Sequence, residues 1–395
     1  MSIFLMTDTS PRVGRNYILF ILIILLNWKC DSAPDFTLSP QFNGTHFSCE
    51  IWNALPGEFG QEIGCSKFKG EDCIYYLTRD AEIVLYFLNG EKDSLRIPPS
   101  LKKRLGINPE EVIGFCMAND SYWFNTPMTD TVFELSADLT SIDPHYIDLG
   151  KLNADATIKR GLGLISCKRH LVHVTKNQLF LPMIQHYTKP GSSDQIPTNY
   201  RTIGMFSQSS GGLTLRKDFG SLPANYYSEN MYFNTSSYSF KGDTVLVNYH
   251  FNDSIELYNK GVLINTIEMK SRKSSEFIGL KGPSLDIMAV KEHQIQHPRY
   301  IELVYDQFRN LYYRTFLVES KNMQGKIIPH EKWRLMVYDH KFRPIDEFEF
   351  NCADFSPATL FVIKEGILIR DFRNFDRNNP QKAEFELLTW EEKEV

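Results

Sequence analysis

The segment that most constrains the fold is residues 238–269, in which four short runs of strand-forming residues are separated by turns. The runs are rich in Val, Ile, Leu, Tyr and Thr, and the turns consist mainly of Asn, Asp, Lys and Gly. β-branched and aromatic residues favour strands, whereas Asn, Asp and Gly favour tight connections between antiparallel strands. Such short turns leave no room for a crossover helix. The segment therefore predicts a four-stranded meander, which is the blade unit of a β-propeller.

The outer strand–turn–strand part of this unit recurs along the chain. A single small sheet is not stable alone, because its apolar faces need neighbours, and repetition supplies them. Adding the inner strands to each copy gives six units, with longer loops between some of them. We expect blades at residues 61–98, 111–149, 163–219, 231–268, 299–350 and 359–390.

The last of these units has three predicted strands, whereas the others can supply four. A strand-like segment at residues 45–52 precedes the first unit and has no other partner. Pairing it with residues 383–390 completes the sixth blade and removes the exposed edge at which the ring would otherwise open. The sequence therefore predicts an all-β protein, a six-bladed β-propeller closed by an N-terminal strand.

Composition agrees with this fold. Aromatic residues make up 13% of the sequence, and no long apolar pattern with helical spacing accompanies them, which favours strands. The formal net charge is −5 and both signs are mixed along the chain, so we expect no binding of nucleic acid.

The N-terminus has the pattern of an export signal. Arg12 and Arg15 precede an apolar run at residues 17–26, and polar sequence follows at once. The run is short for a transmembrane helix, which predicts a signal peptide at residues 1–30 and an exported protein. An uncleaved N-terminal anchor is the alternative.

Cys30 lies four residues beyond the apolar run, where a bacterial lipoprotein carries its lipidated cysteine. Trp28 and Lys29 depart from the small residues that a lipobox has at these places. We nevertheless expect a lipid anchor at Cys30, a tether at residues 31–44 and a propeller at residues 45–395, located in the periplasm or on the outer membrane. The chain has six further cysteines, and their spacing leaves buried thiols and one or two disulfides equally open.

A hairpin at residues 301–316 combines aromatic runs with a turn that contains Asp306, Arg309 and Asn310. Its YDQFRNLYYR segment resembles the YDpyrnvYYR segment of a Bacteroidetes family called domain of unknown function 4221. Residues 361–369, FVIKEGILI, are similar to that family's closing FVteeGLyI segment, and the hairpin VYDHKFRPIDEFEF between them also fits. The resemblance is specific over about residues 300–390. It implies an exported, lipid-anchored β-propeller and brings no known activity or catalytic residue.

Four residues are candidate ligand contacts. His293 and His297 have helical i, i+4 spacing in a connection that Pro298 ends, but two histidines without a third ligand do not define a metal site, so we expect no metal. For Arg309 and Arg314, the functional interpretation is recognition of an anion or a sugar near the channel. The structural interpretation, which we favour, is an ion pair with Asp306.

The sequence contains no nucleophile elbow, no calcium loop and no phosphate-binding glycine motif before a helix. We therefore predict no catalytic residue and no cofactor, and expect a binding or scaffold protein for a glycan, a peptide or an envelope protein. A glycan-active hydrolase or lyase with its site at the channel mouth is the alternative, because propellers host both kinds of function. Several converging carboxylates, His or Arg would favour the enzyme, and an aromatic, uncharged mouth would favour binding.

The N-terminal pattern leads to a direct test. We expect metabolic labelling with a fatty acid to mark the wild-type protein and to leave Cys30→Ala unlabelled, because the thiol is the attachment point. Equal labelling of both proteins, or of neither, would contradict the lipid anchor and leave simple secretion.

Overall fold

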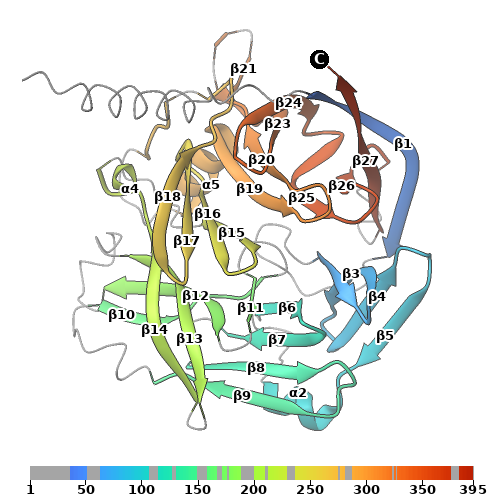
Figure 1. The fold of residues 1–395 in the computed structure, drawn as a ribbon, viewed down its shortest axis with the longest axis vertical. Helices are drawn as coiled ribbons and strands as arrows, with labels where there is room; N and C mark the ends of the chain where they lie inside the picture. The colour runs from blue at the N-terminus through green and yellow to red at the C-terminus, as the bar shows by residue number, and fades with distance from the viewer. Residues whose placement is uncertain are drawn as a thin grey trace, which may run out of the picture.

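The structure is a computed structural model, and six antiparallel sheets form a ring in it (Figure 1). It describes residues 36–50, 63–105, 114–126, 130–148, 158–166, 171–175, 178–187, 200–209, 212–228, 236–274, 276–280, 287–322, 324–325, 327–374 and 382–394. The predicted signal peptide, with Cys30, lies outside these residues. The predicted all-β, six-bladed β-propeller is confirmed.

Each sheet is one blade, and in most blades the strands follow the chain from the centre of the ring outward. Blade 1 contains β2 (Ile63–Phe68), β3 (Glu71–Leu77), β4 (Glu82–Phe87) and β5 (Lys92–Arg96). Blade 2 contains β6 (Gly114–Ala118), β7 (Ser121–Asn125), β8 (Thr131–Ser136) and β9 (Ile142–Tyr146). Blade 3 has five strands, β10 (Ile158–Leu162), β11 (His173–Val174), β12 (Leu179–Tyr187), β13 (Arg201–Ser209) and β14 (Gly212–Ser221).

The remaining blades follow the predicted limits closely. Blade 4 contains β15 (Ser236–Lys241), β16 (Thr244–Tyr249), β17 (Ser254–Asn259) and β18 (Val262–Glu268). Blade 5 contains β19 (Arg299–Asp306), β20 (Leu311–Leu317), β23 (Lys332–Tyr338) and β24 (Pro344–Asn351). Blade 6 contains β25 (Phe355–Val362), β26 (Ile367–Asp371), β27 (Lys382–Glu394) and β1 (Phe36–Glu50).

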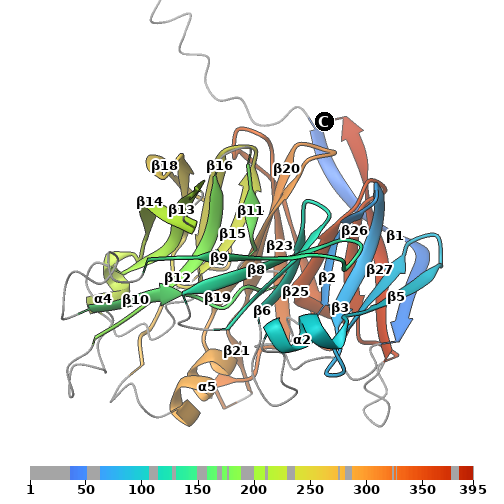
Figure 2. The same ribbon diagram turned by 90° about the horizontal axis from the view of Figure 1, so that it is seen from below.

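The ring is closed as predicted, because β1 pairs antiparallel with β27 (Figures 1 and 2). The strand is longer than expected. It begins at Phe36, so residues 36–44, which were predicted to be tether, belong to the propeller. Leu38 explains the difference, because its side chain is buried in the core between blades 5 and 6. A bulge between Phe42 and His46, with Gly44 at φ 72°, separates the two halves of the strand.

Apolar cores lie between neighbouring blades, and every neighbouring pair in the ring shares one. Strand β3 shows how this arises. Tyr75 and Leu77 pack against blade 2, while Ile74 and Tyr76 pack against blade 6. Successive side chains of a strand point to opposite faces, and both faces of a blade are covered. This double burial accounts for the nearly continuous apolar runs of the inner strands.

Shorter elements occupy the connections: α2 (Pro99–Leu105), α4 (Ala224–Ser228), α5 (Ile287–Gln296), β21 (Ser320–Lys321) and β22 (Ile327–Ile328). Helix α5 lies below the ring in Figure 2, within the connection that the sequence presented as a loop. Within the described ranges, no helix has the length and apolar character needed to cross a bilayer. The structure answers the open question of disulfides for the following cysteines, which are free thiols: Cys49, Cys65, Cys73 and Cys352.

Candidate functional site

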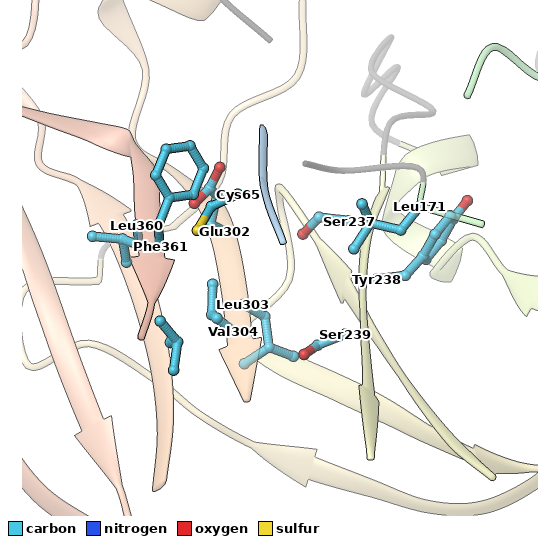
Figure 3. A pocket seen from close by; sticks show the side chains of 11 residues that line it. Cys65, Leu171, Ser237, Tyr238, Ser239, Glu302, Leu303, Val304, Leu360 and Phe361 are labelled. Atoms are coloured by element: carbon cyan, nitrogen blue, oxygen red, sulfur yellow. The ribbon is translucent and has the colours of Figure 1, made fainter. Parts of the chain in front are cut away.

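A cavity of about 200 Å³ lies among the innermost strands, near the centre of the ring (Figure 3). Its walls come from β2, β15, β19 and β25, together with Leu171, which precedes β11. These elements belong to blades 1, 3, 4, 5 and 6, so the cavity is part of the central channel and not a gap within one blade. Channels of this kind are where propellers bring residues from distant parts of the chain together.

Glu302 is the carboxylate of this cavity. It lies at a bulge in β19, where Ile301 and Glu302 together oppose Thr315 of β20. The backbone N–H of Glu302 donates a hydrogen bond to Thr315 Oγ1 at 3.0 Å instead of joining the regular ladder. Bulges re-aim side chains, and in Figure 3 the Glu302 carboxylate lies toward Cys65 and Phe361, across the cavity from Ser237. Glu302 is 5% exposed, so a carboxylate is held in an almost water-free wall.

Two serines of β15 supply hydroxyl groups on the opposite wall. Ser237 and Ser239 are two residues apart in the strand and therefore face the same way. Ser237 Oγ accepts a hydrogen bond from Asn248 Nδ2 at 3.0 Å, and Ser239 Oγ accepts one from the backbone N–H of Tyr305 at 2.9 Å. Because both oxygens act as acceptors, each hydroxyl hydrogen can still be donated to a molecule in the cavity.

The remaining lining is mainly apolar. Leu171, Leu360, Phe361 and Val362 contribute hydrocarbon surface. Cys65 adds a thiol whose pKa is raised well above its usual value, because burial and then the nearby Cys73 disfavour the thiolate. A protonated thiol is a weak nucleophile. The cavity thus combines apolar walls, two hydroxyls and one carboxylate, which suits holding a small molecule better than acid–base chemistry.

Arg314 does not lie in this cavity and does not pair with Asp306, so the predicted ion pair with Asp306 was wrong for Arg314, whereas Arg309 does form it. The alternation of side chains along β20 is the reason. Tyr313 donates its hydroxyl hydrogen to Asp306 Oδ2 at 2.9 Å, and Arg314, the next residue, points to the opposite face, toward blade 4.

Arg314 instead joins blades 4 and 5 through a buried hydrogen-bond network. Its Nε donates to Asn248 Oδ1 at 2.8 Å, and its guanidinium carbon lies 3.4 Å from the ring centroid of Tyr300. The terminal nitrogens donate to backbone carbonyls of blade 4: Asn252 at 2.6 Å, Asp253 at 2.7 Å and Met269 at 2.8 Å. Burial lowers the pKa of Arg314, although Tyr300 and its other neighbours oppose the shift. Arg314 is fully buried, so this arginine serves the fold and not an external anion.

Arg309 is the partner that Asp306 has in the structure. Arg309 Nη1 lies 2.6 Å from Asp306 Oδ2, and Arg309 Nη2 donates to the carbonyl of Lys364 at 2.8 Å. Asp306 also accepts from the backbone N–H of Phe308 and that of Arg309. Arg309 therefore ties the β19–β20 turn of blade 5 to the β25–β26 turn of blade 6.

His293 lies in α5, and its ring stacks on that of His297 with the centroids 4.2 Å apart. Its Nε2 is 2.6 Å from the carbonyl oxygen of Ile278. Burial, followed by the proximity of His297, lowers the pKa of His293 to about 4. The two histidines lie with α5 at the lower face of the ring in Figure 2 and do not line the cavity. No third metal ligand joins them among the described residues.

Three other residues are close enough together to hold a metal ion. His46, Asp371 and Glu386 have ligand atoms within 4.8 Å of one another. They come from β1, β26 and β27, so they cross the seam where the ring closes. Arg373 already lies there, with Nη2 at 2.6 Å from Asp371 Oδ2 and in contact with Glu386. Burial alone would raise the pKa of Asp371, but the hydrogen bonds and charge of Arg373 lower it. The cation of this cluster is thus an arginine.

Sequence analysis missed the cavity residues Glu302, Ser237 and Ser239. One signal was present: Glu302 is a lone acidic residue in the apolar run of an innermost strand. The sequence did not indicate the two serines, because their position in the cavity depends on how β15 is oriented toward the channel.

Neither a protein-family model nor a curated protein matches the sequence. Solved structures match the fold. A protein of the domain of unknown function 4221 family from Bacteroides vulgatus superposes with a TM-score of 0.66, over 90% of this chain and 99% of that chain, at 12% identity. This match shows a shared fold and confirms the architecture that the sequence resemblance implied.

Two further structures match less well. A luciferin-regenerating enzyme gives a TM-score of 0.41 at 7% identity, over 87% of this chain and 95% of that chain. A calcium-binding regucalcin from Agrobacterium tumefaciens gives a TM-score of 0.36 at 12% identity, over 82% of this chain and 88% of that chain.

The Arg314 network leads to a stability prediction. We expect Arg314→Ala to lower the free energy of unfolding by about 3–5 kcal/mol, because it leaves Asn248 and several buried carbonyl oxygens without their donor. Arg216→Ala is the control, since Arg216 is exposed on β14 and its Nε bonds the hydroxyl of Ser207. Urea unfolding measures both. Equal midpoints for the two variants would contradict a structural role for Arg314.

His293 leads to a prediction of pH dependence. Its pKa is about 4 in the folded protein and about 6.5 in an unfolded chain, so the unfolded state binds the extra proton first as pH falls. The stability that neutral His293 contributes is present above pH 6.5 and is lost as pH falls toward 4. We expect His293→Gln to lose less stability than the wild type between pH 7 and pH 5, as measured by urea unfolding. The same loss in both proteins would contradict this assignment.

Proposed function

We propose that this protein is a member of the domain of unknown function 4221 family and acts as a non-enzymatic, ligand-binding β-propeller of the cell envelope. Two observations support the membership: the family-like segments fall on β19–β20 and β25–β26, and the fold matches a protein of that family at a TM-score of 0.66. The observation that carries the binding function is the central cavity, with its apolar wall, two serine hydroxyls and buried Glu302.

The chemistry of the lining supports binding over catalysis. Among the lining residues, Glu302 is the one carboxylate, and neither a histidine nor an arginine accompanies it. Hydrolysis and elimination at a sugar need a second acid–base group at a suitable distance. The other titratable residues of the lining, Cys65 and Tyr238, stay protonated because burial raises the pKa of each.

The size of the cavity limits the ligand. At about 200 Å³ it is smaller than the pockets of roughly 300–1,000 Å³ that hold drug-sized molecules. A free small molecule, one sugar unit of a glycan or one side chain of a peptide fits this space. Hydroxyl donors and a carboxylate acceptor would orient such a ligand, while the apolar wall would supply contact area.

The location is proposed from the N-terminal sequence. The basic residues Arg12 and Arg15, the apolar run and Cys30 support export and a lipid anchor in the periplasm or on the outer membrane. A binding protein held there would meet small ligands of the envelope without crossing the inner membrane.

Filling the cavity is the test of this function. A panel of monosaccharides, amino acids, dipeptides and small amines would be screened by thermal unfolding. A ligand at about 100 times its Kd stabilises the folded state by about 2.7 kcal/mol, which is easily measured as a rise in Tm. We expect at least one compound to stabilise the wild type and to lose its effect on Leu171→Trp, because the indole occupies the cavity.

Thr214→Trp is the matched control, since it adds the same indole to an exposed position of β14. It should keep the response of the wild type. If no compound stabilises the wild type, or if Leu171→Trp responds fully, the cavity is not a ligand site. Release of reducing sugar from an oligosaccharide incubated with the protein would favour the glycan-active hydrolase or lyase instead.

A further inference from the structure

The outermost strand of blade 4 exposes an apolar sheet edge. β18 pairs with β17 on one side, and no strand of the described residues pairs with its other side (Figure 1). Three consecutive apolar side chains of this strand are about half exposed: Val262 at 53%, Leu263 at 49% and Ile264 at 56%. Exposed apolar residues are common singly, but a continuous run on an unpaired edge marks an association surface.

The other outer strands make the contrast clear. Charged residues or proline on an edge strand prevent another strand from adding to the sheet. Five of the six outer strands that the structure describes carry such residues within the strand: β1 has Pro40, β5 has Asp93, β9 has Asp143 and Pro144, β14 has Arg216, Lys217 and Asp218, and β24 has Asp346, Glu347 and Glu349. In β18 the sole charge is Glu268, the last residue. The edge of blade 4 therefore lacks the charges and prolines that protect the other outer strands, and a bulge at Ile264 is its one irregularity among the described residues.

We propose that β18 is a docking surface for a second copy of this chain, related by a two-fold axis through Ile264. With the two strands antiparallel about that axis, Ile264 meets Ile264 and Val262 meets Thr266. The charged residues at the two ends of residues 260–268 indicate which partner fits this edge. Lys260, in the β17–β18 turn, and Glu268, the last residue of β18, are both exposed and lie four residues on either side of Ile264. The long lysine side chain of each copy can therefore reach the glutamate of the other copy. This charge complementarity occurs twice in the pair and favours a second copy over an unrelated strand.

A neighbouring register is less favourable. Centring the axis on Asn265 places Lys260 opposite Lys270 and Val262 opposite Glu268, which opposes like charges and buries a carboxylate against an apolar side chain. A bulge in β18 falls at Ile264, the residue on the proposed axis. Asn265 pairs with Leu257 and Leu263 with Tyr258, so Ile264 has no partner on β17. The contact is small, and side-chain packing with two charge pairs predicts a weak, concentration-dependent dimer.

Charge reversal tests the proposal. The mass of the purified protein would be measured by sedimentation equilibrium from about 5 to about 500 µM, a range that spans weak association. We expect the wild type to shift from monomer toward dimer. Lys260→Glu and Glu268→Lys should each weaken the dimer at least tenfold, because like charges then meet. The double variant should restore wild-type association, since the pairs re-form with exchanged signs.

Additional variants distinguish association through β18 from association through another face of the propeller. Ile264→Lys should abolish the dimer, and Thr214→Lys, which places a lysine at an exposed position of β14, should leave it unchanged. Tm values close to that of the wild type would establish that all variants are folded. A wild type that stays monomeric at the highest concentration would overturn the proposal. So would a dimer that survives Ile264→Lys, or a double variant that fails to recover association.

Discussion

The pairing of β1 with β27 is the interaction on which the rest of the ring depends. Each blade buries both of its faces against neighbouring blades. The first and last blades would therefore each expose one apolar face if the ring did not close. The N-terminal strand provides the outer strand of the C-terminal blade, and its side chains enter two cores at once. Leu38 packs between blades 5 and 6, while Cys49 packs between blades 6 and 1. Joining the two ends of the described chain therefore also joins the first and last blades.

Polar side chains reinforce particular junctions between blades. Arg314 crosses from blade 5 to the carbonyl groups of blade 4, and Arg309 crosses from blade 5 to the turn of blade 6. Both arginines are donors to backbone oxygens that would otherwise be unsatisfied at the ends of strands. Arg373 neutralises Asp371 and Glu386 beside the seam of the ring. These three arginines thus stabilise the scaffold, and the polar groups of the cavity wall are uncharged hydroxyls and one carboxylate.

Two departures from regular strand geometry give the molecule its distinctive surfaces. The bulge in β19 aims Glu302 at the central cavity, and the bulge in β18 leaves Ile264 without a partner at the rim of blade 4. A bulge adds one residue to one strand of a pair, so it changes where a side chain points without disturbing the neighbouring blades. A bulge thus changes the position of one side chain at the inner face and of one at the outer rim of the propeller.

The sequence by itself determined the fold class, the six blades and their closure, because short alternating strands and turns are local patterns that repeat. It also located the Asp306–Asn310 turn and the aromatic strands around it. It did not determine which residues line the cavity or which partner Arg314 has. Cys65, Ser237, Glu302 and Phe361 are widely separated in the chain and meet only when four innermost strands surround one axis. Arg314 bonds to blade 4 and not to Asp306 because the face a strand presents is set by its register with its neighbours, and that register is decided by the tertiary structure.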